Sequence, residues 1–189
     1  MSRSEVASSL ALGLALAGCA PETPATTQDA GSVIVFASDF AGYESWQPSF
    51  HLDGNPDASP PDPDAGCTTP HDTTVPRELY LNGPPRAGSA GFAVGTMIVK
   101  ETRPSDDPST WTVYAMVKRD DDFNPGSGCV GWEWFELSVA GNGATPAQPQ
   151  IQWRGAAPPA SAYQGCTSCV SCHASSPNDC AWSLPTSDF

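Results

Sequence analysis

The sequence predicts an α+β domain, in which a mainly antiparallel β-sheet packs with a few short helices. Near residue 77 the hydrophobic pattern changes from helical spacing to alternation with a period of two. The segments that follow are rich in β-branched and aromatic residues and are bounded by Gly, Pro, Asn or Asp. The spacers between them are short, which favours antiparallel pairing. Twenty prolines in 189 residues disfavour long helices.

The N-terminal residues resemble an export signal. The apolar stretch Val6–Ala17 is shorter than the about 20 residues of a membrane-spanning helix, and it has the length of a signal-peptide hydrophobic region. Small residues precede Cys19, at the place where a bacterial lipoprotein receives its lipid. We therefore expect residues 1–18 to be a lipoprotein signal peptide and Cys19 to anchor an exported chain to a membrane, facing the periplasm or the cell exterior. The alternative is an ordinary secretory signal with a chance cysteine.

The next segments are expected to be a tether and one folded domain. Residues 19–32 contain almost no bulky apolar side chains, which predicts a flexible tether. Residues 33–189 then form the domain. It opens with aromatic residues at helical spacing over 33–46, which predicts a helix. Residues 51–70 are rich in Pro, Asp and Gly, which predicts a loop.

Alternating patterns after residue 76 predict the strands of the sheet. In one of them Trp132 and Trp134 face one side and Phe135 faces the other. The segment that follows the strands, residues 164–179, is short, polar and dense in cysteine. The expected strands are Arg77–Asn82, Gly95–Glu101, Trp111–Lys118, Gly131–Val139 and, less regular than these, Gln150–Arg154.

A C-x-x-C-H motif lies near the C-terminus, at Cys169-Val170-Ser171-Cys172-His173. This spacing is the attachment signature of a c-type heme. Two thiols on one helical turn, Cys169 and Cys172, can add to the two vinyl groups of one porphyrin, and His173 then ligates the iron. The motif therefore predicts a C-terminal heme-binding helix. The alternatives are a chance pattern in a disulfide-rich domain and a zinc site built from Cys166, Cys169, Cys172 and His173, although thiolate clusters are uncommon in oxidising compartments.

The seven cysteines can be divided among these roles. One carries the lipid and two hold the heme, which leaves Cys67, Cys129, Cys166 and Cys180. These four suffice for two disulfides, and three pairings are possible.

The charge excludes one class of partner. The net charge is −13, from 8 Lys and Arg against 21 Asp and Glu. A nucleic-acid binder needs a basic face for phosphate contacts, so no nucleic acid is expected. Docking on anionic lipids is disfavoured for the same reason, which leaves the lipid anchor as the expected membrane contact.

With its strands and motif in place, the domain resembles the cytochrome P-460 family, which includes the cytochromes called c-prime-beta. The resemblance covers about Ala41 to Trp182. The heme motif is the specific part of it, and the order of the other pieces adds to it. Those pieces are Tyr43–Trp46, Arg77–Asn82, Gly95–Glu101, Tyr114–Arg119, Trp132–Phe135 and Cys169–His173 followed by Asp179.

The resemblance implies one covalent heme c per chain, with His173 on one side of the iron and an open face for a small ligand. It also implies a homodimer. In hydroxylamine-oxidising members a lysine matching Lys100 is bonded to the porphyrin, and Arg77 matches an arginine that serves the ligand. The alternatives are a solvent-facing lysine and a surface arginine paired with an acid. Those members also carry a pocket carboxylate near the position of Tyr114, and a phenol is a poor base at neutral pH.

We therefore expect an exported mono-heme c-type cytochrome that acts as an oxidoreductase on small nitrogen species, hydroxylamine or nitric oxide. Lys100 and Arg77 are the candidate catalytic residues, and a redox partner protein would exchange electrons with the heme. One alternative is a non-catalytic sensor or scavenger of nitric oxide. Another is a disulfide-stapled surface module without heme.

Overall fold

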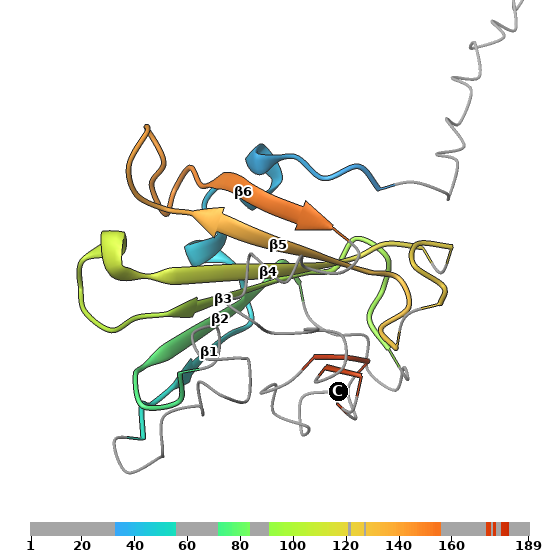
Figure 1. Ribbon diagram of the computed structural model, residues 1–189, viewed down its shortest axis with the longest axis horizontal. Coiled ribbons are helices and arrows are strands. Elements are labelled where there is room, and N and C mark those ends of the chain that lie inside the picture. The colour runs from blue at the N-terminus through green and yellow to red at the C-terminus, as the bar shows by residue number, and fades with distance from the viewer. Residues whose placement is uncertain are drawn as a thin grey trace, which may run out of the picture.

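The chain forms one six-stranded antiparallel sheet in which each strand pairs with its neighbours in the sequence (Figure 1). The computed structural model describes residues 33–55, 72–83, 91–120, 122–126, 128–155, 173, 174, 176 and 179–181. The strand order is β1-β2-β3-β4-β5-β6, so the sheet is a simple meander. The strands are β1 (Ser49–Leu52), β2 (Arg77–Leu81), β3 (Met97–Thr102), β4 (Thr112–Lys118), β5 (Trp132–Ser138) and β6 (Gln150–Gly155).

The mainly antiparallel sheet and its five expected strands are confirmed, with ends that differ from the expectation by one or two residues. Alternation identified them because each strand places one set of side chains on each face. The prediction for residues 51–70 was wrong at its start, since β1 continues through His51 and Leu52. This strand has only four residues, between Pro48 and Gly54, and its pairing with β2 defines it more than its own pattern does.

The helix expected over residues 33–46 is replaced by two short 3-10 helices, η1 (Ala37–Phe40) and η2 (Tyr43–Ser45). Gly42 separates them with a left-handed φ of 67°, which a continuous helix does not accommodate. A third 3-10 helix, η4 (Pro108–Thr110), precedes β4. The described part of the chain is therefore mainly β with some helix, and no helix in it is long and apolar enough to cross a membrane. Most of the expected C-terminal helix lies outside the described residues.

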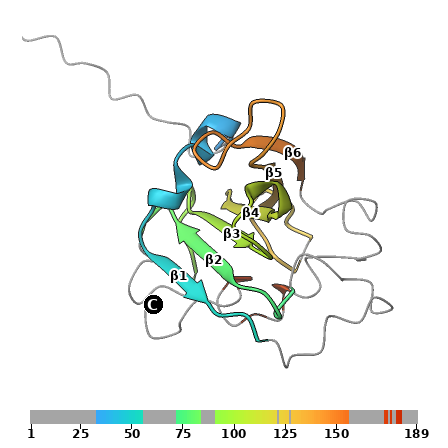
Figure 2. The same ribbon diagram turned by 90° about the vertical axis from the view of Figure 1, so that its left-hand side faces the viewer.

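Both faces of the sheet are covered (Figure 2). The N-terminal segment with η1 and η2 lies on one face, where Phe40 packs edge-on against Phe135 at 5.2 Å. The C-terminal residues Cys180 and Ala181 pack on the opposite face, against an apolar cluster that includes Trp132 and Trp134. The expected division of the β5 aromatic residues between the two faces is confirmed. We call the face that the C-terminal residues cover the site face.

The N-terminal face holds a buried polar network that fixes β3. Glu101 is fully buried and accepts hydrogen bonds from the hydroxyls of Tyr43 and Tyr80 and from Arg103 Nε at 2.7 Å. Burial raises the pKa of Glu101, while the Tyr43 hydrogen bond and the Arg103 guanidinium act against that rise. The buried carboxylate of Glu101 therefore has its hydrogen-bond partners within the network. Lys100, the preceding residue, must therefore point to the opposite face.

The imidazole of His51 on β1 contacts the carboxylate of Glu78 on β2 and the carboxylate of Asp53, which follows β1. Its Nδ1 lies 2.5 Å from Glu78 Oε1, and its Nε2 lies 3.0 Å from Asp53 Oδ1. Hydrogen bonds to Glu78, and then to Asp53, raise the pKa of His51 above its usual value. These hydrogen bonds also contribute to the stability of the folded chain. Because the pKa of His51 is raised in the folded state, their contribution is fully present below the unfolded pKa of about 6.5 and is lost as pH rises through the folded pKa.

We expect a proton NMR titration of the His51 ring to give a midpoint above that of an unperturbed histidine. Glu78→Gln should lower the midpoint more than Asp53→Asn does, because the Glu78 hydrogen bond is the largest cause of the shift. An unshifted midpoint in the wild-type chain would show that the ring is not held between the two carboxylates in solution.

Candidate heme site

Five residues of the site face stand directly opposite one another across β2 to β6. Leu79 pairs with Lys100, Lys100 with Tyr114, Tyr114 with Glu136, and Glu136 with Trp153. We call this set the cross-strand row. All but Leu79 are only partly buried. The row therefore places an amine, a phenol and a carboxylate side by side on the face that the C-terminal residues cover.

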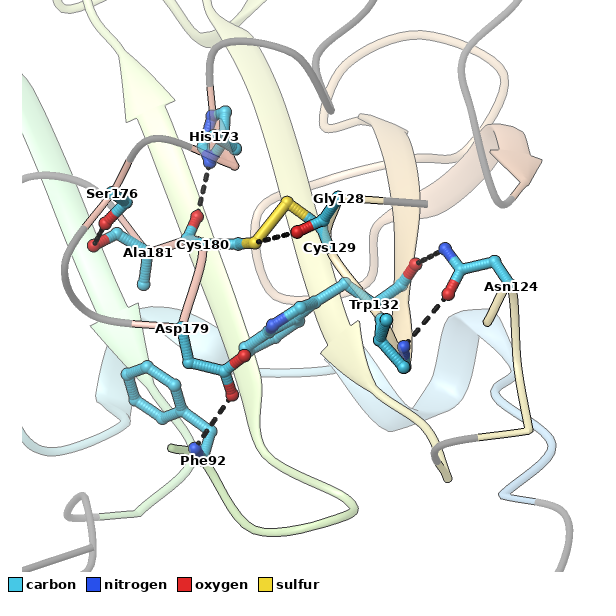
Figure 3. The surroundings of a disulfide bond; sticks show 12 residues. Phe92, Asn124, Gly128, Cys129, Trp132, His173, Ser176, Asp179, Cys180 and Ala181 are labelled. Atoms are coloured by element: carbon cyan, nitrogen blue, oxygen red, sulfur yellow. Dashed lines mark hydrogen bonds between the residues drawn. A yellow bond between two sulfur atoms is a disulfide. The ribbon is translucent and has the colours of Figure 1, made fainter. Parts of the chain in front are cut away.

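His173 packs on this face beside the row. It is 8% exposed, and its ring lies edge-on against the Trp134 indole with the ring centroids 4.7 Å apart. Its Nδ1 lies 2.6 Å from the backbone carbonyl of Cys180 (Figure 3). A carbonyl oxygen can only accept a hydrogen bond, so Nδ1 is the donor and carries the proton. In the neutral ring, Nε2 then carries the lone pair that binds a metal ion.

The surroundings of His173 keep its ring neutral. Burial, together with the positive charge of Lys100, lowers the pKa of His173 to about 4, against the opposing effect of the hydrogen bond to the Cys180 carbonyl. A ring with this pKa is neutral at pH 7, which is the form that ligates iron. The influence of Lys100 on this pKa also shows that the two residues share one electrostatic environment.

Lys100 and Arg77 both belong to the site face. Lys100 lies at the centre of β3 within the cross-strand row. Arg77 lies two residues before Leu79 on β2, so it has the same orientation one step along the strand. The chain contains two lysines, Lys100 and Lys118. Lys118 donates a hydrogen bond to the carbonyl of Val130 and forms an ion pair with Asp179, and Lys100 is the lysine whose charge acts on His173.

Among the described residues, several polar atoms of the site face are buried without a hydrogen-bond partner. They include Nε of Arg77, the hydroxyl of Thr102, and the indole nitrogens of Trp132 and Trp134. Arg77 and Thr102 stand directly opposite each other on β2 and β3. Buried donors are normally satisfied by protein, water or a bound group. Thr102 stands opposite Thr112 at the start of β4, and Trp132 stands opposite Lys118 at its end, so these donors lie towards opposite ends of the site face. Each is suited to a ligand group that carries an acceptor.

Glu136 is the residue of this site that sequence reasoning missed. It is half-buried, pairs directly with Tyr114, and has a pKa raised by burial. The family resemblance implies a pocket carboxylate near the position of Tyr114. The structure places the carboxylate of Glu136 directly opposite Tyr114 on the next strand. Cross-strand register could have revealed it, but register follows from pairing and not from the pattern of β5 alone.

The structure assigns one of the disulfides. Cys129 and Cys180 are bonded, with their Cα atoms 5.8 Å apart. This selects one of the three pairings that the sequence left open. The other cysteines with expected roles lie outside the described residues, as do the whole expected signal peptide and tether, residues 1–32. These cysteines are Cys19, Cys67, Cys166, Cys169 and Cys172.

Three of the four residues of the zinc alternative, Cys166, Cys169 and Cys172, lie outside the described residues. Among the residues that the structure describes, no three His, Cys, Asp or Glu side chains come together to hold a metal ion. A heme iron needs only one or two protein ligands, because the porphyrin supplies the others. His173, oriented through Nδ1 and lying next to unsatisfied buried donors, meets that smaller requirement.

A surface hollow of about 310 Å³ lies elsewhere, between η1 and the turn before β6. Its lining includes Ser38, Gln148 and Gln150 and contains no titratable side chain. It therefore offers no group for acid–base or redox chemistry, and the site face remains the candidate site. Comparisons of the chain with protein-family models, with curated proteins and with solved structures give no match, so the candidate site is defined by its own geometry.

Proposed function

We propose that the chain is an exported mono-heme c-type cytochrome of the P-460 type, an oxidoreductase that acts on hydroxylamine or nitric oxide. The observation that carries the proposal is the state of His173. The histidine of a C-x-x-C-H motif is buried, neutral and oriented through Nδ1 to a backbone carbonyl, so its Nε2 would ligate the iron of a bound heme. Cys169 and Cys172 would hold the porphyrin by thioether bonds.

The site face supplies the groups that the chemistry needs. A bound heme would provide one-electron redox chemistry and a coordination position for a small ligand. Oxidation of hydroxylamine removes protons as well as electrons, and Glu136 is a carboxylate whose raised pKa suits proton acceptance. Arg77 carries a buried Nε that can donate to a polar ligand or a heme carboxylate. The electrons would leave to a redox partner protein.

The location proposed for the protein is outside the cytoplasm, with Cys19 as a lipid anchor. The Cys129–Cys180 disulfide supports export, because disulfides form and persist in oxidising compartments. Attachment of c-type heme takes place in the same kind of compartment. The remaining pair, Cys67 and Cys166, would then form the second disulfide.

Expression with c-type maturation machinery, followed by intact-mass and absorption measurements, tests the proposal. We expect the mass of one heme on the wild-type chain and none on the Cys169→Ala/Cys172→Ala variant. Zinc without heme would support the alternative site, and a chain with two disulfides and no cofactor would support the surface module. Either result would overturn the cytochrome proposal.

Lys100→Ala separates catalysis from simple binding. If Lys100 is bonded to the porphyrin, the wild-type heme should stay on its Lys100 peptide after digestion, and Lys100→Ala should lose both that link and hydroxylamine turnover. Tyr114 favours the alternative of a nitric-oxide sensor or scavenger, since it stands where a carboxylate was expected. A heme held by thioethers alone, which binds nitric oxide without turnover, would establish that alternative.

A further inference from the structure

The C-terminal residues are fastened to the sheet at two adjacent positions (Figure 3). Cys180 is bonded to Cys129, which is fully buried just before β5. Asp179 accepts a hydrogen bond from the backbone nitrogen of Phe92 at 3.1 Å and forms an ion pair with Lys118 at 3.0 Å. A covalent bond and a partly buried charged pair thus converge on two consecutive residues.

The backbone of these two consecutive residues adopts an uncommon conformation. Asp179 and Cys180 have φ values of 44° and 66°, both in the left-handed region. Two consecutive non-glycine residues hold this conformation only where their surroundings impose it. Here it accompanies the approach of the Cys180 carbonyl to His173 Nδ1, at 2.6 Å. The residue that carries the disulfide is therefore also the residue that orients the histidine.

The partners of His173 restrain its ring from two sides. The carbonyl of Cys180 receives the Nδ1 proton, and the indole of Trp134 lies edge-on against the ring. Trp134 belongs to β5 and is fixed by the sheet. Cys180 belongs to no strand, so the position of its carbonyl depends on the fastenings of the C-terminal residues.

We propose that the Cys129–Cys180 disulfide is a positioning element for the axial ligand, because it holds the Cys180 carbonyl that keeps His173 in the Nδ1–H tautomer. This inference rests on the proposed function for its consequence at the iron. The tautomer itself is measured in the chain without heme, so that result does not depend on the proposed function. Loss of the disulfide would release the carbonyl, and the ring would take the Nε2–H tautomer that free histidine favours, with the iron-binding nitrogen blocked.

The test is nitrogen NMR of the His173 ring in the full chain, prepared without heme at pH 7. In the wild-type chain we expect a protonated Nδ1 and an unprotonated Nε2. In Cys129→Ala/Cys180→Ala, which keeps the backbone carbonyl, we expect a mixture in which the Nε2–H form increases. Phe40→Leu, on the opposite face, serves as a control with lowered stability, and it should keep the wild-type tautomer. An unchanged tautomer in the double variant would overturn the proposal.

Asp179→Ala provides a second test that does not depend on the folding of the double variant. It removes the Phe92 and Lys118 contacts and leaves the disulfide in place. We expect the Nδ1–H tautomer to persist; its loss would assign the positioning to Asp179 and overturn the role of the disulfide. In chains that carry heme, the double variant should also show a changed iron–histidine vibration. A wild-type chain that binds no heme would contradict the proposed function and leave the tautomer result standing.

Discussion

Removal of the Cys129–Cys180 disulfide is expected to lower the free energy of unfolding by about 4 kcal/mol. The bond closes a loop across a sequence separation of 51 residues. Opening that loop increases the conformational entropy of the unfolded chain, and the estimate follows from the length of the loop in a chain-entropy model. The measurement is equilibrium unfolding in urea, comparing the wild-type chain with Cys129→Ala/Cys180→Ala in the absence of reductant.

The single variants provide the control for this experiment. Either Cys129→Ala or Cys180→Ala alone breaks the same bond, so each should be destabilised nearly as much as the double variant, and the effects should not add. The m-value should rise, because an unfolded chain without the bond exposes more surface. Additive effects of the two single substitutions would mean that the cysteines stabilise the chain by packing and not through their bond.

The second large effect is expected at Glu136. In the proposed reaction, Glu136→Gln should lower kcat for hydroxylamine oxidation on the order of 100-fold, with a smaller change in KM, because the amide cannot accept a proton. Burial raises the pKa of Glu136, so the wild-type rate should fall as pH drops through that raised pKa. Tyr114 stands directly opposite Glu136 on β4, Lys100 lies one strand further along the same row on β3, and His173 packs on the same face. The variant should lose the acid limb of the pH profile.

Glu44→Gln is the matched control for Glu136→Gln. It makes the same chemical change at an exposed carboxylate on η2, whose partner Arg103 belongs to the opposite face. Its turnover and pH profile should match those of the wild-type chain. If Glu136→Gln also retains wild-type turnover, the carboxylate of the cross-strand row is not the proton acceptor, and Tyr114 or water must be considered instead.

The strands could be predicted from the sequence because alternation is a local property. Trp132, Trp134 and Phe135 show this well: their order along β5 determines which face each one covers, and the structure confirms it. The helix over residues 33–46 could not be predicted correctly, because aromatic spacing does not reveal that Gly42 adopts a left-handed conformation. β1 was missed because its four residues derive their structure from pairing with β2.

Sequence reasoning pointed to residues of the candidate site through one motif and one family resemblance, and it did not reach the residues that only strand pairing brings beside them. His173 was identified from its spacing to two cysteines, and Lys100 and Arg77 from the family resemblance. The carboxylate of Glu136 was not identified, since an isolated glutamate in an alternating strand is typical of a solvent-facing residue. The pairing of Cys129 with Cys180 was also left open, because it depends on where the C-terminal residues cross the sheet.

The meander order of the strands has a consequence for assembly of the protein. Every strand pairs with its sequence neighbour, so each new strand can add to the edge of the part of the sheet already formed. All six strands precede His173 in the sequence, and the last of them ends at Gly155. The sheet can therefore form before the C-terminal residues dock on it. In the proposed cytochrome, this order would give the maturation machinery access to Cys169 and Cys172 before Cys180 reaches Cys129 and His173 docks on the site face.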